Sequence, residues 1–323
     1  MNRPRILQNG RLLPSLEAAL EQQFDVHPLW KEADPDAYLR AHGGEFVGMV
    51  TSAIKGGSRE FLALLPNLKV ISSFGVGYDA LDVVGAQHRG IAVGYTPDVL
   101  NDCVADTAFS LVINVARRFP ACDQFTRRGD WLKGAFPLTT KVSGKRMGIL
   151  GLGRIGQTIA RRASGFDMAI RYHNRKPRND VAYDYEPSLK ALAEWCDFLV
   201  IASAGGAETK HLVSREILEA VGPKGFVVNI SRGSVIDEEA MIDALAQGRL
   251  GGAGLDVYTH EPNVPERLLK LDNVVLLPHL ASATHETRQA MADLVMANLT
   301  EFFQTGHVKV AVPPLAPSTP REG

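Results

Sequence analysis

One segment limits the possible folds of this chain more than any other. Residues 145–162 read KRMGILGLGRIGQTIARR: an apolar strand pattern, then G-x-G-x-x-G, then a helical pattern. In that context Gly151 permits a tight turn, Gly153 lets a pyrophosphate approach the backbone, and Gly156 lets the helix pack closely on the strand. Backbone amides at the start of the helix would then hold the phosphates. The segment therefore predicts a dinucleotide-binding βα unit.

The rest of the chain supplies the strands that such a unit needs. From Arg146 onward the β-rich runs are almost continuously apolar, as expected of parallel strands covered on both faces: RMGILGLG, MAIRYHN, FLVIASA, GFVVNIS, GAGLDVY and NVVLLPH. Residues 4–100 hold a smaller set, PRILQN, FVGMVTS, LKVISSFG and GIAVGYT, separated by amphipathic segments. The sequence thus predicts an α/β fold with two βα domains, each built on a doubly wound parallel sheet.

Two helical patterns lie outside these sets. Residues 101–118 form a long one, with Asn101 or Asp102 as the expected N-cap. Met291–Gly306 is amphipathic and follows the last strand of the second set, so we expect it to cross back to the first domain. A length of 323 residues suits two domains of about 100–200 residues each.

The overall charge excludes some classes of partner. The chain has 35 Lys and Arg against 36 Asp and Glu, a net charge of −1, so no global field favours nucleic acid or an anionic membrane. The first residues lack the uninterrupted apolar run of a signal peptide, and a cytoplasmic location is expected. Cys103, Cys122 and Cys196 lack metal-ligand or disulfide-framework spacing. We interpret them as free thiols and expect no metal.

The segment YHNRKPR, residues 172–178, bears on the choice of nucleotide. In units that bind NAD, an acid about 20 residues beyond the glycine loop takes the ribose 2′-hydroxyl. Here the second strand ends in Asn174, followed by Arg175 and Lys176. A carboxylate would repel a 2′-phosphate, whereas a neutral Asn beside two cations accepts it through charge-assisted hydrogen bonds. The segment predicts a preference for NADP(H) over NAD(H); the alternative interpretation is a solvated basic turn.

Three later segments place chemical groups at the carboxyl ends of predicted strands. They contain Arg232 in NISRGSVID, Asp256 and Glu261 in GLDVYTHEP, and His279 in LPHLAS. Ligands of doubly wound sheets bind at that edge, so these side chains should converge near a nicotinamide. Arg232 can bind a carboxylate and polarise a 2-oxo group, and His279, paired with Glu261, can donate a proton to the carbonyl oxygen. Singly, each has a structural explanation: a surface arginine, a turn residue before Pro262, a core histidine.

At this point a resemblance becomes clear. GLGRIG, NISRGSVIDE, GGAGLDVYTHEP and NVVLLPHLASAT resemble the signature segments of the D-isomer-specific 2-hydroxyacid dehydrogenases, and the most similar subgroup is the glyoxylate/hydroxypyruvate and hydroxyphenylpyruvate reductases. The resemblance covers most of residues 50–312. It implies Rossmann-like and flavodoxin-like domains: a discontinuous substrate-binding domain of residues 1–98 and 286–323, and an inserted NAD(P)-binding domain of residues 99–285. It also implies a homodimer formed largely through the inserted domain.

The resemblance implies site residues as well. The family's catalytic Arg, Glu and His match Arg232, Glu261 and His279, and the amides of Val76 and Gly77 in FGVGYD match those that receive the substrate carboxylate. FGVGYD could instead be only a glycine turn. The implied substrate contacts are Val76, Gly77, Arg232 and His279. The implied cofactor contacts are Gly151, Gly153, Arg154, Ile155, Gly156, Asn174, Arg175, Lys176, Ala202, Ile230 and Asp256, the last near the nicotinamide carboxamide.

Residues 204–207 depart from the family pattern. Relatives usually carry a Pro-containing segment at this place, which leaves Ser203 and Thr209 as cofactor contacts to be tested. Trp131 and Phe136 lie where relatives can reach across the dimer toward the partner's substrate, although such aromatics more often form interface core.

We expect an NADPH-dependent reductase of small 2-oxo acids, with glyoxylate and hydroxypyruvate favoured and arylpyruvates next, that yields D-2-hydroxy acids. Two alternatives remain open. One is an NAD-linked relative of the phosphoglycerate or formate dehydrogenase type, against which Asn174 and Arg175 argue. The other is a nucleotide-sensing, corepressor-like binding protein, which could retain Arg232, Glu261 and His279.

Overall fold

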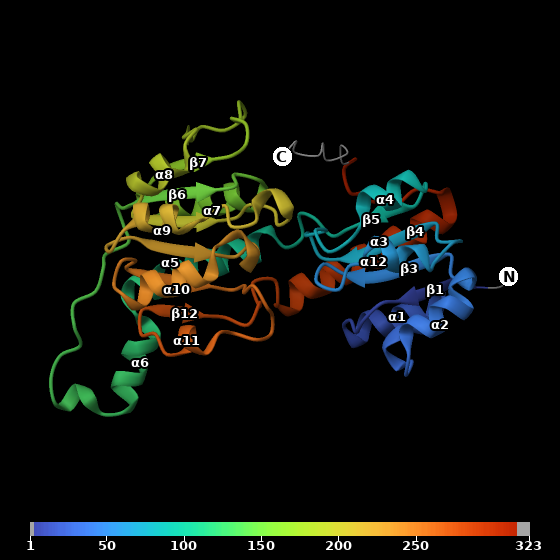
Figure 1. The fold of residues 1–323 in the computed structure, drawn as a ribbon, viewed down its shortest axis with the longest axis horizontal. Coiled ribbons are helices and arrows are strands. Elements are labelled where there is room, and N and C mark those ends of the chain that lie inside the picture. The colour runs from blue at the N-terminus through green and yellow to red at the C-terminus, as the bar shows by residue number, and fades with distance from the viewer. Residues whose placement is uncertain (1–2, 315–323) are drawn as a thin grey trace. The chain divides into compact units, whose positions relative to one another are not determined.

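The computed structural model describes residues 3–314, which divide into two compact units. Unit 1 comprises the described residues up to Leu100 and from Thr284 onward, and unit 2 comprises Asn101–Ala283 (Figure 1). The chain therefore returns to the unit in which it begins, as the sequence predicts for a discontinuous domain with a second domain inserted into it.

Unit 1 is built on a five-stranded parallel sheet with the order β2-β1-β3-β4-β5, the flavodoxin-like arrangement. Its strands are β1 (Arg5–Gln8), β2 (Asp25–Pro28), β3 (Gly48–Ser52), β4 (Val70–Phe74) and β5 (Ala92–Gly94). Its helices are α1 (Pro14–Gln23), α2 (Pro35–His42), α3 (Arg59–Ala63), α4 (Val83–His88) and α12 (His285–Thr305), with short 3-10 turns η1 (Leu29–Lys31) and η2 (Gly43–Glu45). The sequence pattern does not predict β2, because DVHP is short, mostly polar and ends in proline.

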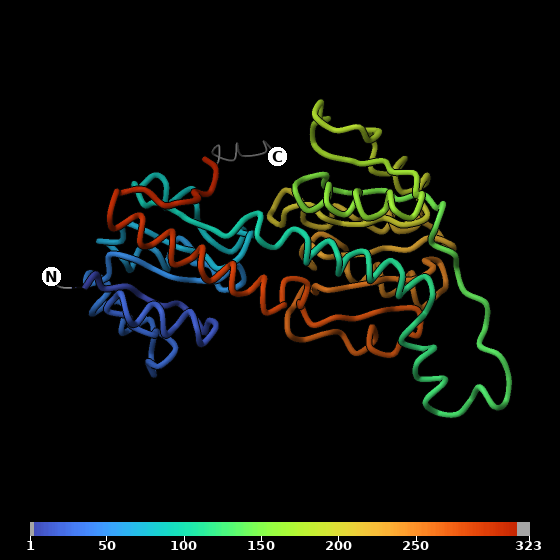
Figure 2. The backbone as a smooth tube through the Cα atoms, turned by 180° about the vertical axis from the view of Figure 1, so that it is seen from behind, coloured from blue at the N-terminus to red at the C-terminus, as the bar shows by residue number. Residues whose placement is uncertain are grey.

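Helix α12 packs on β4, on a face of this sheet where small residues make room for it (Figure 2). A Cβ on Gly94 would come within 2.7 Å of Asn298, and the Ser72 hydroxyl donates a hydrogen bond to the carbonyl of Val295 (3.2 Å). This helix belongs to unit 1 and begins at His285 rather than at the expected Met291. The strand residues that alternate with these enter the core with α2, α3 and α4: Leu7, Met49, Ile71 and Val93.

Unit 2 is built on a seven-stranded parallel sheet with the order β12-β11-β10-β9-β6-β7-β8. Its strands are β6 (Arg146–Leu150), β7 (Ala169–His173), β8 (Asp184–Tyr185), β9 (Phe198–Ile201), β10 (Phe226–Asn229), β11 (Gly252–Leu255) and β12 (Val274–Leu276). Counted from β6, this is the 3-2-1-4-5-6 order of dinucleotide-binding sheets with one strand added beyond β11. The strand order reverses between β6 and β9, which is where such sheets bind their ligands.

Helices cover the sheet of unit 2 and also extend away from it. They are α5 (Asn101–Arg117), α6 (Phe119–Arg127), α7 (Arg154–Ser164), α8 (Leu189–Trp195), α9 (Arg215–Val221), α10 (Glu238–Ala246) and α11 (Glu266–Leu269), with 3-10 turns η3 (Asp130–Leu132), η4 (Ala207–Thr209) and η5 (Gly233–Val235). Helix α6 and the segment after it extend away from the sheet (Figures 1 and 2). In the part of the chain that the structure describes, no helix is long and apolar enough to cross a membrane.

Helix α5 packs closely on the sheet. A Cβ on Gly252 would come within 2.9 Å of Val115, and one on Gly254 within 3.0 Å of Leu111. The expected N-cap at Asn101 or Asp102 is wrong, because the helix already begins at Asn101. Asp102 instead lies in the first turn and pairs with Arg161 and Arg162 of α7, at 3.0 Å each.

Candidate functional site

The glycine loop lies between β6 and α7, at the reversal of the strand order. Gly151 has φ of +97°, and a Cβ there would come within 2.5 Å of the backbone nitrogen of Ser203, so only glycine fits the turn. A Cβ on Gly156 would lie 2.3 Å from the carbonyl oxygen of Gly151, which explains how α7 approaches the loop so closely. At Gly153, by contrast, a Cβ would meet no described atom within 4 Å. The loop is tight except at the glycine where a pyrophosphate would approach.

The N-terminus of α7 is suited to an anion. Gly153 occupies the N-cap position and provides no side-chain cap, so the first amides of the helix, at Arg154 and Ile155, have no capping side chain. Beside the loop, the Ser203 hydroxyl is buried and has no hydrogen-bond partner among the described residues. The Thr209 hydroxyl already donates to the carbonyl of Ala204 (2.9 Å). The sequence offers the hydroxyls of Ser203 and Thr209 as cofactor contacts to be tested. Ser203 is the better candidate of the two, because its hydroxyl has no partner among the described residues.

Two other predicted cofactor residues lie just beyond neighbouring strands. Ala202 follows β9 and donates its amide to the carbonyl of Leu150 at the end of β6 (2.8 Å). Ile230 follows β10 and is buried. Both positions border the carboxyl edge of the sheet, where a nucleotide would lie.

The loop after β7 holds the glycine loop in place. Asn174 Oδ1 accepts a hydrogen bond from the amide of Leu152 (2.8 Å), and Arg178 Nη1 donates to the carbonyl of the same residue (3.0 Å). Arg178 also pairs with Asp180. With its oxygen engaged, Asn174 offers a ligand its amide hydrogens, which suits a phosphate oxygen. The sequence does not predict that Arg178 holds the glycine loop, because these contacts of Arg178 depend on the path of the loop after β7.

The two remaining cations of that segment, Arg175 and Lys176, are exposed. The Arg175 guanidinium pairs with the carboxylate of Glu208 in η4. Glu208 could not be found from the sequence, since it directly follows residues 204–207, which depart from the family pattern, and no motif marks it.

Arg232, Glu261 and His279 come together at the carboxyl ends of β10, β11 and β12. His279 Nδ1 and Glu261 Oε2 are 2.6 Å apart, and Glu261 Oε1 accepts the amide of Tyr258 (3.0 Å). Burial raises the pKa of Glu261, but the hydrogen bonds from His279 and Tyr258 and the nearby charge of Arg232 lower that pKa below its ordinary value. The carboxylate therefore stays ionised and can stabilise a positively charged His279.

The backbone at Arg232 lies directly against the segment that carries Glu261. A Cβ on Gly233 would come within 1.9 Å of the backbone of Tyr258, so a side chain would force the two segments apart. The Asn229 side-chain amide fixes the Arg232 carbonyl (2.9 Å). These contacts explain how residues from separate strands form one cluster.

The turn that carries His279 is strained and braced. His279 has φ of +51°, a left-handed conformation that disfavours a side chain. The two oxygens of Asp256 accept the amides of Leu280 (2.8 Å) and Ala281 (3.0 Å), and the Tyr258 hydroxyl donates to the carbonyl of Leu277 (2.9 Å). Burial raises the pKa of Asp256. A hollow of about 260 Å³ lies against the turn, lined by Tyr258, Glu261 and His279 with mainly apolar neighbours. Asp256, expected at the nicotinamide, is seen to hold the His279 turn.

The predicted carboxylate-binding loop lies in unit 1. Gly75 has φ of +146°, and a Cβ there would come within 2.4 Å of Ala53. Its amide donates to the Thr96 hydroxyl (3.0 Å), and its carbonyl accepts the Thr96 amide (3.0 Å). Val76 and Gly77 follow this fixed residue at the end of β4 and are partly exposed.

The cysteines and potential metal ligands add no second site. Cys103, Cys122 and Cys196 form no disulfide with one another, and burial raises the pKa of Cys196 to about 12, which makes it a poor nucleophile. Within residues 3–314 no group of three or more His, Cys, Asp or Glu side chains could hold a metal ion.

Comparisons with known proteins agree with this geometry. Residues 109–281 match the family described as D-isomer specific 2-hydroxyacid dehydrogenase, NAD binding domain. The chain is 46% identical over 288 residues to glyoxylate/hydroxypyruvate reductase A of Arabidopsis thaliana and, over the same length, to hydroxyphenylpyruvate reductase of Plectranthus scutellarioides; each alignment covers 89% of this chain and 92% of the relative. Among solved structures, NADPH-dependent glyoxylate/hydroxypyruvate reductase of Sinorhizobium meliloti, in complex with NADP and malonate, is 42% identical with a TM-score of 0.89, over 97% of both chains.

Proposed function

The chain belongs to the D-isomer-specific 2-hydroxyacid dehydrogenase family and is an NAD(P)-dependent oxidoreductase; from that premise we propose that it reduces small 2-oxo acids with NADPH. Glyoxylate and hydroxypyruvate are the favoured substrates, and arylpyruvates are the next class to test. The product is the D-2-hydroxy acid. The hydrogen-bonded pair of His279 and Glu261 beside Arg232 is the observation that carries the proposal.

In this proposal His279 is the proton donor. Its Nδ1 is held by Glu261, so the opposite ring nitrogen, Nε2, delivers a proton to the carbonyl oxygen of the substrate. Bound NADPH supplies the hydride to the carbonyl carbon, and one hydride plus one proton convert the C=O group to CH–OH. The ionised Glu261 hydrogen-bonds to His279 Nδ1 and so fixes the orientation of the imidazole ring. Hydroxy acid oxidation is the same step in reverse, with His279 as the base.

Arg232 is proposed to bind the substrate. Its guanidinium can donate two parallel hydrogen bonds to a carboxylate and polarise the adjacent carbonyl. In unit 1, the amides of Val76 and Gly77 are proposed as donors to a substrate carboxylate. Such positioning fixes the carbonyl carbon relative to the hydride donor.

The preference for NADPH rests on the loop after β7. Asn174 is neutral, its oxygen already accepts the Leu152 amide, and Arg175 and Lys176 follow it. These groups favour the doubly charged 2′-phosphate over a hydroxyl. The glycine loop and the α7 N-terminus, with Arg154 and Ile155, are proposed to hold the pyrophosphate. Ala202, Ile230 and Asp256 complete the proposed cofactor site, with Asp256 near the nicotinamide carboxamide.

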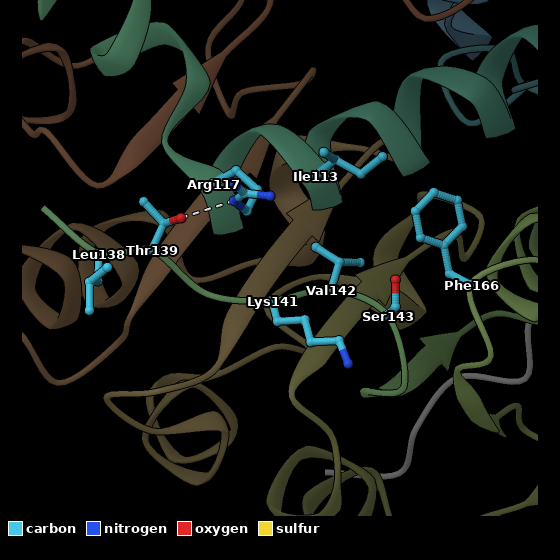
Figure 3. A pocket seen from close by; sticks show the side chains of 8 residues that line it. All are labelled: Ile113, Arg117, Leu138, Thr139, Lys141, Val142, Ser143 and Phe166. Carbon is cyan, nitrogen blue, oxygen red and sulfur yellow. Dashed lines mark hydrogen bonds between the residues drawn. The ribbon is translucent and has the colours of Figure 1, made fainter. Parts of the chain in front are cut away.

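We also propose a homodimer, with a second copy as the partner of the surface around α6. No residue of α6 is buried, and four large apolar side chains in and after it are exposed: Phe119 (44%), Trp131 (71%), Leu132 (94%) and Leu138 (102%). One of them, Leu138, also lines a hollow of about 380 Å³, together with Ile113, Val142, Phe166 and others (Figure 3). None of the proposed catalytic residues lines this hollow. Exposed apolar surface of this kind is typical of an interface.

Light scattering after size exclusion tests the dimer. The parent should elute as a dimer, and Trp131→Glu with Leu132→Glu should shift it to monomer. A parent that is monomeric at micromolar concentration would contradict the proposal.

The cytoplasmic location stays a prediction of the sequence, to be checked by cell fractionation.

Initial rates test the activity. Oxidation of NADPH and of NADH is measured with glyoxylate, hydroxypyruvate, phenylpyruvate and 4-hydroxyphenylpyruvate. Faster turnover with NADPH supports the proposal, and the ranking of substrates defines the side-chain pocket. Faster turnover with NADH would favour the NAD-linked alternative. Tight nucleotide binding without turnover on any 2-oxo acid would favour the nucleotide-sensing alternative.

A further inference from the structure

The ion pair between Arg175 and Glu208 spans the glycine loop. In the sheet of unit 2, β6 lies between β7 and β9, and the glycine loop follows β6. Arg175 comes from the loop after β7, and Glu208 comes from η4 after β9. The pair therefore joins the two loops that flank the phosphate-binding turn, at the end of the site where the adenosine ribose of a dinucleotide lies.

Glu208 is held in this position by its own loop. The Thr209 hydroxyl donates to the carbonyls of Ala204 (2.9 Å) and Gly206 (3.1 Å), and the Thr209 amide donates to the Gly206 carbonyl (3.1 Å). These bonds close a short 3-10 turn that carries Glu208 at its centre. The carboxylate thus stays near Arg175 even when the pair opens.

Two other side chains of residues 172–178, those of Asn174 and Arg178, already have hydrogen-bond partners within the protein. Arg178 is held by Asp180 and by the carbonyl of Leu152, and the oxygen of Asn174 is held by the amide of Leu152. Arg175 and Lys176 are therefore the cations positioned to meet a 2′-phosphate, and the carboxylate of Glu208 already engages one of them.

We propose that Glu208 is a specificity-determining residue that acts against NADPH. Its carboxylate pairs with Arg175 and must release that guanidinium for a 2′-phosphate to bind there. It then remains close to that phosphate and repels it. This inference rests on the proposed function, in which Arg175 binds the 2′-phosphate. NADH carries a hydroxyl there, needs no cation, and is insensitive to Glu208.

The exposure of the pair sets the size of the effect. The side chains are 85% and 65% exposed, and ion pairs at such positions are weak and screened by salt. Glu208 therefore tunes the cofactor preference and does not block NADPH. Removing its charge should tighten NADPH binding by about 2- to 5-fold at low salt, with less gain at high salt.

The test measures dissociation constants of NADPH and NADH by fluorescence titration for the parent, Glu208→Gln and Glu208→Ala. Glu216→Gln is the matched control, because Glu216 is equally exposed (65%) and pairs with Lys190 at 2.9 Å between α8 and α9. Arg175→Ala and the double variant Arg175→Ala/Glu208→Gln complete a cycle that isolates the coupling of the two residues.

The expected result is tighter NADPH binding in both Glu208 variants, unchanged NADH binding, no effect of Glu216→Gln, and loss of the gain when Arg175 is alanine. A parent that prefers NADPH and loses that preference in Arg175→Ala, together with inert Glu208 variants, would overturn this inference and leave the proposed cofactor intact. Weaker NADH binding in Glu208→Gln would also overturn it, since Glu208 would then be a ribose contact. Equal binding of both nucleotides by the parent and by Arg175→Ala would contradict the cofactor proposal itself.

Discussion

The two ends of the proposed site in unit 2 are built by different means. At the nicotinamide end, the His279 turn is braced by Asp256, which is 1% exposed, and by the hydroxyl of Tyr258, which is 6% exposed. At the adenosine end, Arg175 and Glu208 lie on the surface, with more than half of each side chain exposed. Both ends depend on charge, but the first shields its charges more from water, since only 28% of the His279 side chain and 24% of the Glu261 side chain are exposed.

Because of this difference, the catalytic step and the choice of cofactor depend on different residues. Buried hydrogen bonds are strong and specific, and they hold a strained backbone in the one geometry that permits proton transfer. Ion pairs between exposed side chains contribute little free energy, so one such pair is easily replaced by another. Substitutions at the buried end should therefore change the rate, and substitutions at the exposed end should change the choice of nucleotide.

The largest expected effect is that of His279→Ala. Loss of the proton donor should lower kcat by about 10²–10⁴-fold, while the dissociation constant of NADPH stays near that of the parent. Arg232→Ala, by comparison, should raise KM and lower kcat together. Steady-state rates across pH and nucleotide titrations check the split, with His260→Ala as a control because His260 is exposed on the same segment as Glu261. A His279→Ala variant that turns over like the parent at every pH would refute the proton-donor role.

The next effect belongs to the exposed end. Asn174→Asp combined with Arg175→Ala should shift the ratio of NADPH to NADH affinity by about 10- to 100-fold toward NADH, since charge-assisted hydrogen bonds to the phosphate are lost and a repulsive charge is added. A carboxylate at position 174 can still accept the Leu152 amide, so the glycine loop should persist. Arg171→Ala is the control, because Arg171 stacks on Trp195. An unchanged ratio would show that other residues read the phosphate.

Those features of the fold that follow from local pattern could be predicted. The glycine spacing and the continuous apolar runs predict a parallel sheet, and adjacent parallel strands bring Arg232, Glu261 and His279 to one edge. The strands β2 and β8 were missed. β2 is only four residues long and mostly polar, and β8 has two residues, so neither has the apolar pattern of a buried strand.

The braces of the site could not be predicted. The bonds from Asp256 to the 280 and 281 amides, from Tyr258 to Leu277 and from Arg175 to Glu208 depend on how irregular loops cross in space. Sequence identifies the residue types and the strand that precedes each one. It carries no signal for a loop path once a segment such as residues 204–207 departs from the family pattern.

A pair of tyrosines offers a smaller and sharper test of the comparison. Tyr258→Phe removes the hydroxyl bonded to Leu277 at the buried end, and Tyr185→Phe removes the hydroxyl bonded to the Asn174 carbonyl (3.1 Å) at the exposed end. Each loses a hydrogen bond worth about 1 kcal/mol or roughly 5-fold, and Tyr258→Phe also loses a longer contact to the Leu255 carbonyl (3.5 Å). Tyr258→Phe should lower kcat at constant NADPH affinity, and Tyr185→Phe should weaken NADPH at constant kcat. If both variants changed only kcat, or both changed only the NADPH dissociation constant, the assignment of rate to the buried end and of nucleotide binding to the exposed end would be wrong.

The smallest effect lies inside the buried end, where two carboxylates have pKa values shifted in opposite directions. The pKa of Glu261 is lowered from its ordinary 4.5, so its contribution to folding is present above that pH and is lost as the pH falls through the native pKa. Burial raises the pKa of Asp256 above 3.8, so the native state favours the protonated acid and loses stability as the pH rises through the native pKa.

Urea unfolding of the parent, Glu261→Gln and Asp256→Asn from about pH 3 to pH 7 separates the two contributions. The stability difference between the parent and Glu261→Gln should shrink toward low pH. For Asp256→Asn the pH-dependent part has the opposite sign, because the substitution removes the cost of a buried charge at neutral pH while it exchanges one acceptor oxygen for a donor. Parallel curves for the two variants would mean that the carboxylates titrate alike. The buried end would then owe its geometry to packing, and the contrast with the exposed end would rest on burial alone.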